Sequence, residues 1–349
     1  MELENTSKIK GIFVWMIIFS HNKQYYNLAL YNKYIYIKIL RNIGQKMVSL
    51  FLFYSGYGIV ESIKKKGIIY AKTLPKKGAI LFIKFQLVLI IFLINNIICR
   101  IKVTLKQYIL SVIFKRSIGN SNWFAFTIIS LYFSSFFSFI FIKNIKHIII
   151  SVIINTTLCF IHIYIVYNYF YPKLIYPVDN ILSFVIGLYY SLLQNYLNKI
   201  FIKNDIYYFG SLSFFVLIYY YFLKLPNNIY FISITNSLFC LIIIMISMKV
   251  ELQNEFLMFL NNHSYSIYLL QRVVMIFIYH HKYFHNSFFI RFIFIFITVL
   301  FISCIFDKYT FCINNLFNKI KKKNFEFHII KLYKYPELNE RDKLFNLKI

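Results

Sequence analysis

The sequence predicts an all-α membrane protein, a polytopic bundle of about ten transmembrane helices with both termini in the cytoplasm. Hydrophobic residues make up 59% of the 349 residues and the mean hydropathy is +0.62, which is more apolar than a soluble globular domain. Charged residues make up 15%, and they gather between apolar runs of about 17 to 25 residues, the length that crosses a bilayer as a helix. The runs are continuous rather than alternating, so helices are expected rather than β-strands.

Each apolar run is expected to form one span. The first is short enough to imitate a signal peptide, but His21, Asn22 and Lys23 follow it instead of a small-residue cleavage site, so we expect it to be retained. The ten expected spans cover residues 11–27, 46–62, 78–99, 123–142, 147–169, 181–197, 207–223, 229–248, 264–280 and 288–306.

The distribution of positive charge predicts the orientation of these spans. With the N-terminus inside, the inner segments and their borders hold 23 Lys and Arg, the outer ones hold 13, and three lie within spans. The positive-inside rule then places both termini in the cytoplasm. Two outer segments, 28–46 and 100–116, are also basic, and their mixture of aromatic and basic residues suits helices that lie on the membrane surface.

Two domains are expected: a membrane domain over 1–306 and a basic cytoplasmic tail over 307–349. The tail carries ten Lys and Arg against five acids, which suits either contact with the anionic inner leaflet or a solvated segment. The whole chain has a formal net charge of +27, and 33 of its 39 basic residues are Lys. The abundance of Lys, Ile, Asn and Phe is typical of A/T-rich codons, so genome composition explains part of this charge. Loops retained in the cytoplasm explain the rest, so nucleic acid is not an expected partner.

Lys10 and His21 stand at the two ends of the first span, in the stretch KGIFVWMIIFSHN. They are eleven residues apart, which at about 100° per residue places them on one helix face and about 16 Å apart along the axis. One hypothesis is that both look into one cavity. The alternative is that Lys10 reaches the inner interface and His21 marks the outer one.

The second span reads FLFYSGYGIVESIKKKG, residues 51–67. Ser55, Gly56 and Gly58 allow another helix or a ligand to approach closely. Gly is a poor helix former, so helix propensity does not explain the two glycines in mid-membrane. The lysines that follow either bind phosphates or simply hold the loop in the cytoplasm.

These two blocks together carry a resemblance to a known family. A basic residue, ten residues and a histidine, followed by FxFYSGYG, resemble the acyltransferase 3 family of bacterial membrane O-acyltransferases. Later blocks resemble it in the same order: GNSNWFAFTIISLY (119–132), DNILSFVIG (179–187) and LNNHSYSIYLLQR (260–272). The chain departs from the family in having Lys10 where Arg is usual and Gln271 where the commoner form has a second histidine.

The resemblance implies transfer of an acyl group, often acetyl, from cytoplasmic acyl-CoA to a hydroxyl of a cell-surface glycan or its lipid-linked precursor, in the bacterial inner membrane. Acyl-CoA is then a co-substrate, and no bound cofactor is expected. His21 is the candidate general base, because a neutral imidazole with an ordinary pKa of about 6.5 suits this role. A second possibility is that His21 briefly carries the acyl group itself.

Other residues are assigned to the parts of such a site. Lys10 and Lys84 are candidates for the CoA phosphates or the thioester oxyanion, and Lys84, inside the third span, requires a wet cavity or a partner. Lys76 and Lys77 are assigned to the same inner, acyl-CoA-binding group. The expected cavity residues are Ser55, Gly56, Tyr57, Gln271 and Arg272.

On the outer side, Asn120, Asn122 and Trp123 combine hydrogen-bonding groups with a ring on which a sugar can stack, and Asn180 lies at the start of the sixth span. These four are the candidate acceptor-binding residues, with membrane anchoring for Trp123 and helix capping for Asn180 as the alternatives. No metal site is expected, because no acid or Cys lies beside His281 and His285.

Two other functions fit a basic membrane bundle. A transporter or flippase for lipid-linked glycans is the main alternative, but such proteins usually have two matching halves with broken helices, and none is visible in this sequence. A glycan polymerase or ligase would be expected to have a large outer loop, whereas the expected outer loops here are only about twenty residues long. The predicted function is therefore a membrane O-acyltransferase.

Overall fold

The computed structural model describes residues 3–24, 43–170, 178–226, 228–250, 252, 254–283 and 287–324. All regular secondary structure in these ranges is helical, which confirms the all-α prediction. The chain divides into two compact units, Met1–Asp307 and Lys308–Ile349.

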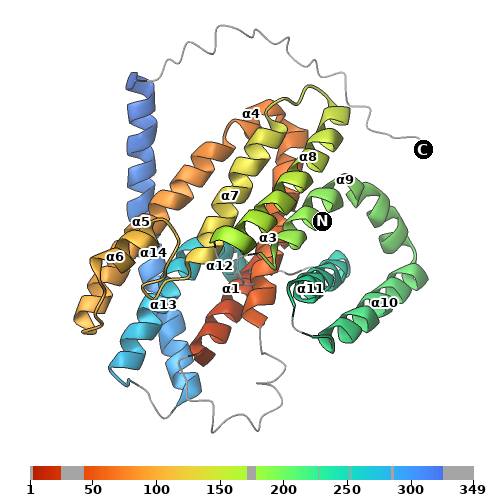
Figure 1. The fold of residues 1–349 in the computed structure, drawn as a ribbon. Coiled ribbons are helices and arrows are strands. Elements are labelled where there is room, and N and C mark those ends of the chain that lie inside the picture. The colour runs from red at the N-terminus through yellow and green to blue at the C-terminus, as the bar shows by residue number, and fades with distance from the viewer. Residues whose placement is uncertain are drawn as a thin grey trace. The chain divides into compact units, whose positions relative to one another are not determined.

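Each expected span corresponds to one long helix, with differences at the ends (Figure 1). These helices are α1 (Leu3–Gln24), α3 (Ile43–Lys66), α5 (Leu74–Ile98), α7 (Asn122–Phe139), α8 (Ile145–Ile165), α9 (Ile181–Lys203), α10 (Asp205–Leu223), α11 (Ile229–Lys249), α13 (Ser264–His280) and α14 (Phe288–Asn324). Helix α8 continues as a π-helix, η2, over Val166–Phe170.

Six stretches of the described residues are helical, long and apolar enough to cross a membrane, so the chain is a multi-pass membrane protein. They are Ile68–Ile98, Asn122–Phe139, Lys146–Tyr169, Asp205–Leu223, Ile229–Lys249 and Phe288–Cys312. The remaining long helices, α1, α3, α9 and α13, are not among these six stretches. Ten spans and two cytoplasmic termini stay a prediction.

Three short helices join the long ones. Helix α4 (Ile68–Ala71) links α3 to α5. Helix α6 (Leu105–Val112) begins at a capping box between Thr104 and Gln107, inside the segment 100–116 for which a surface helix was expected. Helix α12 (Glu255–Asn262) was not predicted, and its N-terminus is capped by the side chain of Asn254.

The expected tail boundary at residue 307 does not end a helix, because α14 runs on to Asn324. Residues 325–349 of the expected tail lie outside the described residues, and contact of the tail with the inner leaflet stays a prediction. Most of the segment 28–46, the other expected surface helix, also lies outside them.

Close backbone contacts at glycines hold the interior helices together. A Cβ added at Gly56 of α3 would lie 2.3 Å from the Phe184 carbonyl oxygen of α9, and one added at Gly187 of α9 would lie 2.1 Å from the Phe53 carbonyl oxygen. Helices α3 and α9 therefore cross with their backbones in contact, as small residues permit in membrane proteins. Gly11 allows a similar approach of α1 to α12, 2.1 Å from the Leu257 carbonyl oxygen.

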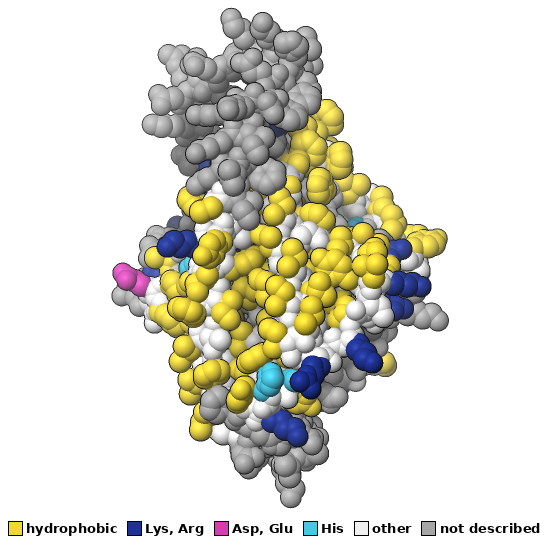
Figure 2. All heavy atoms as spheres, turned by 90° about the vertical axis from the view of Figure 1, so that its left-hand side faces the viewer, with side chains coloured by type: hydrophobic (Ala, Val, Ile, Leu, Met, Phe, Trp, Pro, Cys, Tyr) yellow, Lys and Arg dark blue, Asp and Glu magenta, His cyan; other side chains and the backbone are white. Residues whose placement is uncertain are grey.

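The outer surface of the bundle is apolar. Figure 2 shows a continuous hydrophobic face on the side where Figure 1 places α5, with Lys and Arg near its edges. Ile90, Ile94 and Ile97 of α5 are 46%, 53% and 68% exposed on such a surface. Exposed apolar residues of this extent, bordered by cations, are typical of a lipid-facing helix.

Candidate active site

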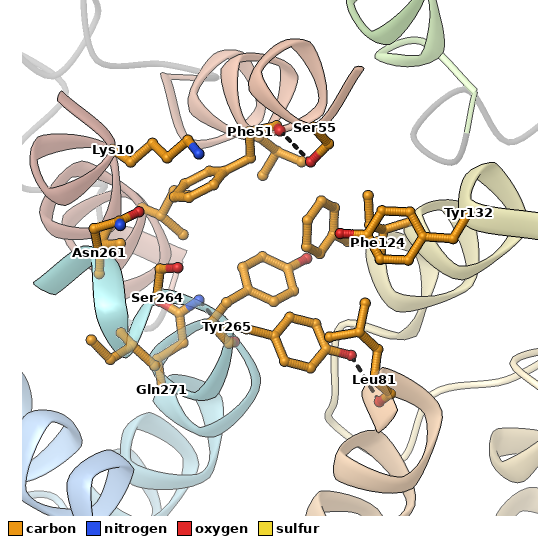
Figure 3. A pocket seen from close by; sticks show the side chains of 16 residues that line it. Lys10, Phe51, Ser55, Leu81, Phe124, Tyr132, Asn261, Ser264, Tyr265 and Gln271 are labelled. Atoms are coloured by element: carbon orange, nitrogen blue, oxygen red, sulfur yellow. Dashed lines mark hydrogen bonds between the residues drawn. The ribbon is translucent and has the colours of Figure 1, made fainter. Parts of the chain in front are cut away.

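A cavity of about 190 Å³ lies inside the bundle, between α1, α3, α5, α7, the end of α12 and α13 (Figure 3). Most of its wall is apolar or aromatic. The polar side chains of the wall are Lys10, Ser55, Tyr132, Asn261, Ser264, Tyr265, Tyr268 and Gln271. The elements that form this wall are distant in sequence, so only the packed bundle creates the cavity.

Hydrogen bonds position two sides of the wall. The Tyr265 hydroxyl of α13 donates to the Leu81 carbonyl of α5 at 3.1 Å, which joins the two helices at the cavity. The Ser55 hydroxyl donates to the Phe51 carbonyl of its own helix at 2.8 Å, and both bonds are drawn in Figure 3. Ser55 is one of the residues that line the cavity, and its part in the site stays a prediction.

Lys10 lies at one end of this cavity. Figure 3 shows its side chain extending from α1 into the space beside Phe51, and its ammonium nitrogen lies 5.3 Å from the centre of the Tyr54 ring. Among the described residues, the ion pairs join other side chains and none involves Lys10. A cation held only by an aromatic face retains much of its capacity to attract an anion.

His21 lies next to the other end of the cavity. Val14 and Ile17 line the wall between it and Lys10, so the helical stripe Lys10–Val14–Ile17–His21 follows one face of α1. The His21 ring centre is 6.4 Å from that of Tyr268. Gln271 and Arg272 of the same helix are electrostatic neighbours of the His21 ring. His21 is not itself part of the wall; it adjoins the cavity through Tyr268 and Gln271.

Gln271 is fully buried in the cavity wall. Its Nε2 donates to the Tyr268 carbonyl at 3.1 Å, and the Tyr268 ring packs 4.8 Å from Phe124 of α7. Within the described part of the chain, the Gln271 Oε1, the Tyr268 hydroxyl and the His21 Nδ1 are buried without hydrogen-bond partners. Such atoms cost free energy unless a ligand or water satisfies them.

Gly56 and Tyr57 lie on a different face of α3 from the cavity. Gly56 contacts the backbone of α9, and the Tyr57 hydroxyl donates to Gln194 of α9 at 2.8 Å. Helical geometry explains this, because adjacent residues point about 100° apart and Ser55 already faces the cavity. Arg272 is also not one of the residues that line the cavity; its charge interacts with the His21 ring.

The candidate acceptor residues are already engaged in the fold. Asn122 donates to the Phe114 and Arg116 carbonyls at 2.7 and 2.8 Å, and the Asn120 Oδ1 accepts from the Ile118 amide at 2.9 Å. Gly119, between Ile118 and Asn120, has φ +115°, a conformation that favours glycine. Their amides shape the loop before α7, and binding of an acceptor sugar stays a prediction.

The other two acceptor candidates are also placed by packing. Asn180 is buried before α9, where its Oδ1 accepts from Asn236 of α11 at 3.0 Å. Trp123 is partly buried against the hydrophobic core, and its ring lies 6.1 Å from that of Phe124. Phe124, rather than Trp123, belongs to the cavity wall.

Lys84 forms an ion pair with Asp307 of α14, with 2.7 Å between Nζ and Oδ1. The same carboxylate accepts from Ser266 at 2.5 Å and contacts the His263 Nδ1 at 2.7 Å. The sequence predicted either a wet cavity or a partner for a lysine within a span, and it did not identify Asp307 or His263. Lys84 is absent from the cavity wall, and its role in acyl-CoA binding stays a prediction.

Lys76 and Lys77 lie in the first turn of α5. Lys76 is exposed. The Lys77 ammonium donates to the Tyr70 hydroxyl at 2.9 Å and lies 4.1 Å from the centre of that ring. Within the described ranges no three His, Cys, Asp or Glu residues are grouped to hold a metal, and His285 lies outside those ranges.

Fold and cavity together define a multi-pass helical membrane protein whose interior combines a lysine, an imidazole and unsatisfied polar groups. The model of the acyltransferase 3 family, described as an acyltransferase domain, matches residues 9–308. The chain therefore belongs to this family and is an acyltransferase, as the sequence motifs predicted. Neither the curated proteins nor the solved structures contain a match to it.

Proposed function

We propose that this acyltransferase moves an acyl group, with acetyl the expected one, from cytoplasmic acyl-CoA to a hydroxyl of a cell-surface glycan or its lipid-linked precursor. The membrane would be the inner membrane of a bacterium. The observation that carries the proposal is the cavity that has Lys10 at one end and the unsatisfied atoms of Tyr268 and Gln271, with His21 beside them, at the other. Such an arrangement suits two substrates that meet from opposite ends.

The end of the cavity at Lys10 suits the donor. The lysine supplies a positive charge for a CoA phosphate or for the oxyanion that develops on the thioester carbonyl. Asn261 and Ser264, from the turn between α12 and α13, add hydrogen-bonding groups to the same wall. The lysines at the start of α5, Lys76 and Lys77, would extend the attraction for phosphate to the surface.

The His21 end suits the reaction. As general base, the imidazole takes the proton of the acceptor hydroxyl while that oxygen bonds to the thioester carbonyl carbon. The carbon–sulfur bond then breaks, and the proton passes to the departing CoA thiolate. The products are an O-acyl ester and free CoA thiol, and the imidazole returns to its neutral form.

A direct test compares purified, detergent-solubilised wild-type chain with His21→Ala, using acetyl-CoA and measuring thiol release with and without a polysaccharide acceptor. We expect His21→Ala to lose on the order of 100-fold or more in turnover. His281→Ala, at an exposed histidine after α13, is the matched control and should keep wild-type turnover. Equal rates for His21→Ala and wild type would remove His21 from the mechanism.

A further inference from the structure

The direction of the Gln271 amide is fixed inside the bundle. The side chain has no exposed surface, and its Nε2 is bound to the Tyr268 carbonyl at 3.1 Å. This bond leaves Oε1 as a buried acceptor, without a partner among the residues that the structure describes. Leaving a buried acceptor unsatisfied costs about 1 to 3 kcal/mol, so a role that requires the free oxygen is expected.

The imidazole of His21 carries the complementary atom. Its Nδ1 is also buried without a partner in the described ranges. The His21 ring centre lies 6.4 Å from that of Tyr268, the residue whose carbonyl holds the Gln271 amide. Helices α1 and α13 bring them together, because Ile17, one turn before His21, and Gln271 line the same wall.

Three described carboxylates of the helices around α1 are engaged elsewhere, and a fourth, Glu255 at the start of α12, is exposed. Asp179 accepts from Gln45 at 2.5 Å, Asp307 binds Lys84 at 2.7 Å, and Glu61 binds Lys64 at 2.9 Å. A histidine base usually depends on a third group that holds its ring and selects its tautomer. At His21 the neighbouring acceptor suited to that role is an amide.

We propose that Gln271 is a positioning residue for His21. Its Oε1 accepts the Nδ1 hydrogen, which leaves Nε2 with the lone pair that removes the proton from the acceptor hydroxyl. An uncharged partner does not stabilise the imidazolium as a carboxylate would, so the ring stays neutral and basic at rest. An amide also partners the histidine in Cys–His–Asn sites. This inference rests on the proposed function of His21 and gives Gln271 a role of its own in place of the second histidine of the commoner motif.

The charges around His21 make a pH profile informative. Arg272 acts on the ring from α13, where Tyr268 also lies beside it. From α3, Tyr54 contacts Lys10 rather than His21, and α12 packs against α1 near Gly11. A carboxylate introduced at position 271 would therefore place a negative charge next to the imidazole.

The test measures kcat, KM and the pH profile of acetyl-CoA turnover for Gln271→Met and Gln271→Glu. Methionine keeps the shape of glutamine but loses the acceptor, so kcat should fall on the order of tenfold or more with little change in KM. Glutamate keeps an acceptor and adds a negative charge that stabilises the imidazolium, so activity should persist and the acid limb should move to higher pH. Gln194→Glu, which keeps the acceptor for Tyr57 on α9, should show the wild-type profile.

Two results would overturn the inference while leaving the proposed function intact. One is wild-type kcat in Gln271→Met, and the other is an unshifted acid limb in Gln271→Glu, each with His21→Ala still inactive. Loss of the proposed function has a different signature, since His21→Ala would then match wild type. A thermal unfolding scan of each variant separates loss of the fold from loss of positioning.

Discussion

Two lysines in apolar helices have different environments in this protein. Lys84 is neutralised by Asp307 at 2.7 Å, whereas Lys10 extends into the cavity and contacts the Tyr54 ring. Isolated charges within a membrane are costly and are retained mainly where they face water, a partner or a ligand. At the scale of single residues, Lys10 is therefore the stronger candidate for contact with an anionic substrate.

Replacing Lys10 tests this difference. Lys10→Ala should weaken acetyl-CoA binding about 10- to 100-fold, because a hydrogen bond to a charged group contributes about 1.5 to 3 kcal/mol. Lys10→Arg should restore binding, since it returns the charge and adds a planar fork. Calorimetric dissociation constants for the three proteins decide the matter, and an unchanged constant for the alanine variant would contradict a donor-binding role.

At the scale of helices, the crossing of α3 and α9 depends on the missing side chains at Gly56 and Gly187. Gly58 is two residues from Gly56 on α3, yet an added Cβ there meets nothing within 4 Å. The two glycines thus differ in packing while sharing one helix. Only the first is required by the approach of another backbone.

We expect Gly56→Ala to destabilise the protein by about 1 to 3 kcal/mol through overpacking. Gly58→Ala should be neutral or stabilising by up to about 1 kcal/mol, because alanine is the better helix former. Thermal unfolding in detergent, followed by intrinsic fluorescence, compares the two. If both variants unfolded at the same temperature, the α3–α9 contact would not have the closeness described.

The ion pair between α5 and α14 makes a second prediction at this scale. Asp307→Asn leaves the partly buried Lys84 without its carboxylate and should destabilise the bundle by about 3 kcal/mol. Adding Lys84→Met should recover part of this loss, because removing both charges costs less than removing one. The comparison is a double-mutant cycle of melting temperatures, and strictly additive losses would argue against a direct pair.

At the scale of the whole molecule, several hydrogen bonds join helix ends that alternating spans would place on one side of a membrane. Gln45 at the start of α3 donates to Asp179 before α9, and Lys249 at the end of α11 pairs with Asp205 at the start of α10. These pairs fit the alternating spans that the apolar runs predicted. The direction of the bundle relative to the cytoplasm is tested separately.

Single cysteines introduced into a cysteine-free chain report that direction. Lys72→Cys lies between α4 and α5 on the expected inner side, and Lys282→Cys follows α13 on the expected outer side; both positions are exposed. In right-side-out membrane vesicles, an impermeant maleimide should label position 282, and position 72 only after permeabilisation. The reverse pattern would invert the topology.

The sequence was most informative where a single helix carries the signal. Apolar run length predicted the long helices, and the spacing of Lys10 and His21 predicted a shared face, because both depend on local geometry. It was least informative about partners between helices. Which face of α3 meets α9, which acid neutralises Lys84 and where the Asn122 amide donates all depend on tertiary packing that composition and spacing do not encode.

The backbone contact at Gly187 has a consequence for how the chain is made. The ribosome delivers α3 to the translocon long before α9 exists, so the nascent α3 has no surface to receive its glycine face. In nascent chains stalled before residue 181, the glycine face of α3 should therefore stay accessible to a membrane insertase. Once α9 has been synthesised, α9 should cover that face. We therefore expect the α3–α9 contact to form only after Gly187 has been synthesised.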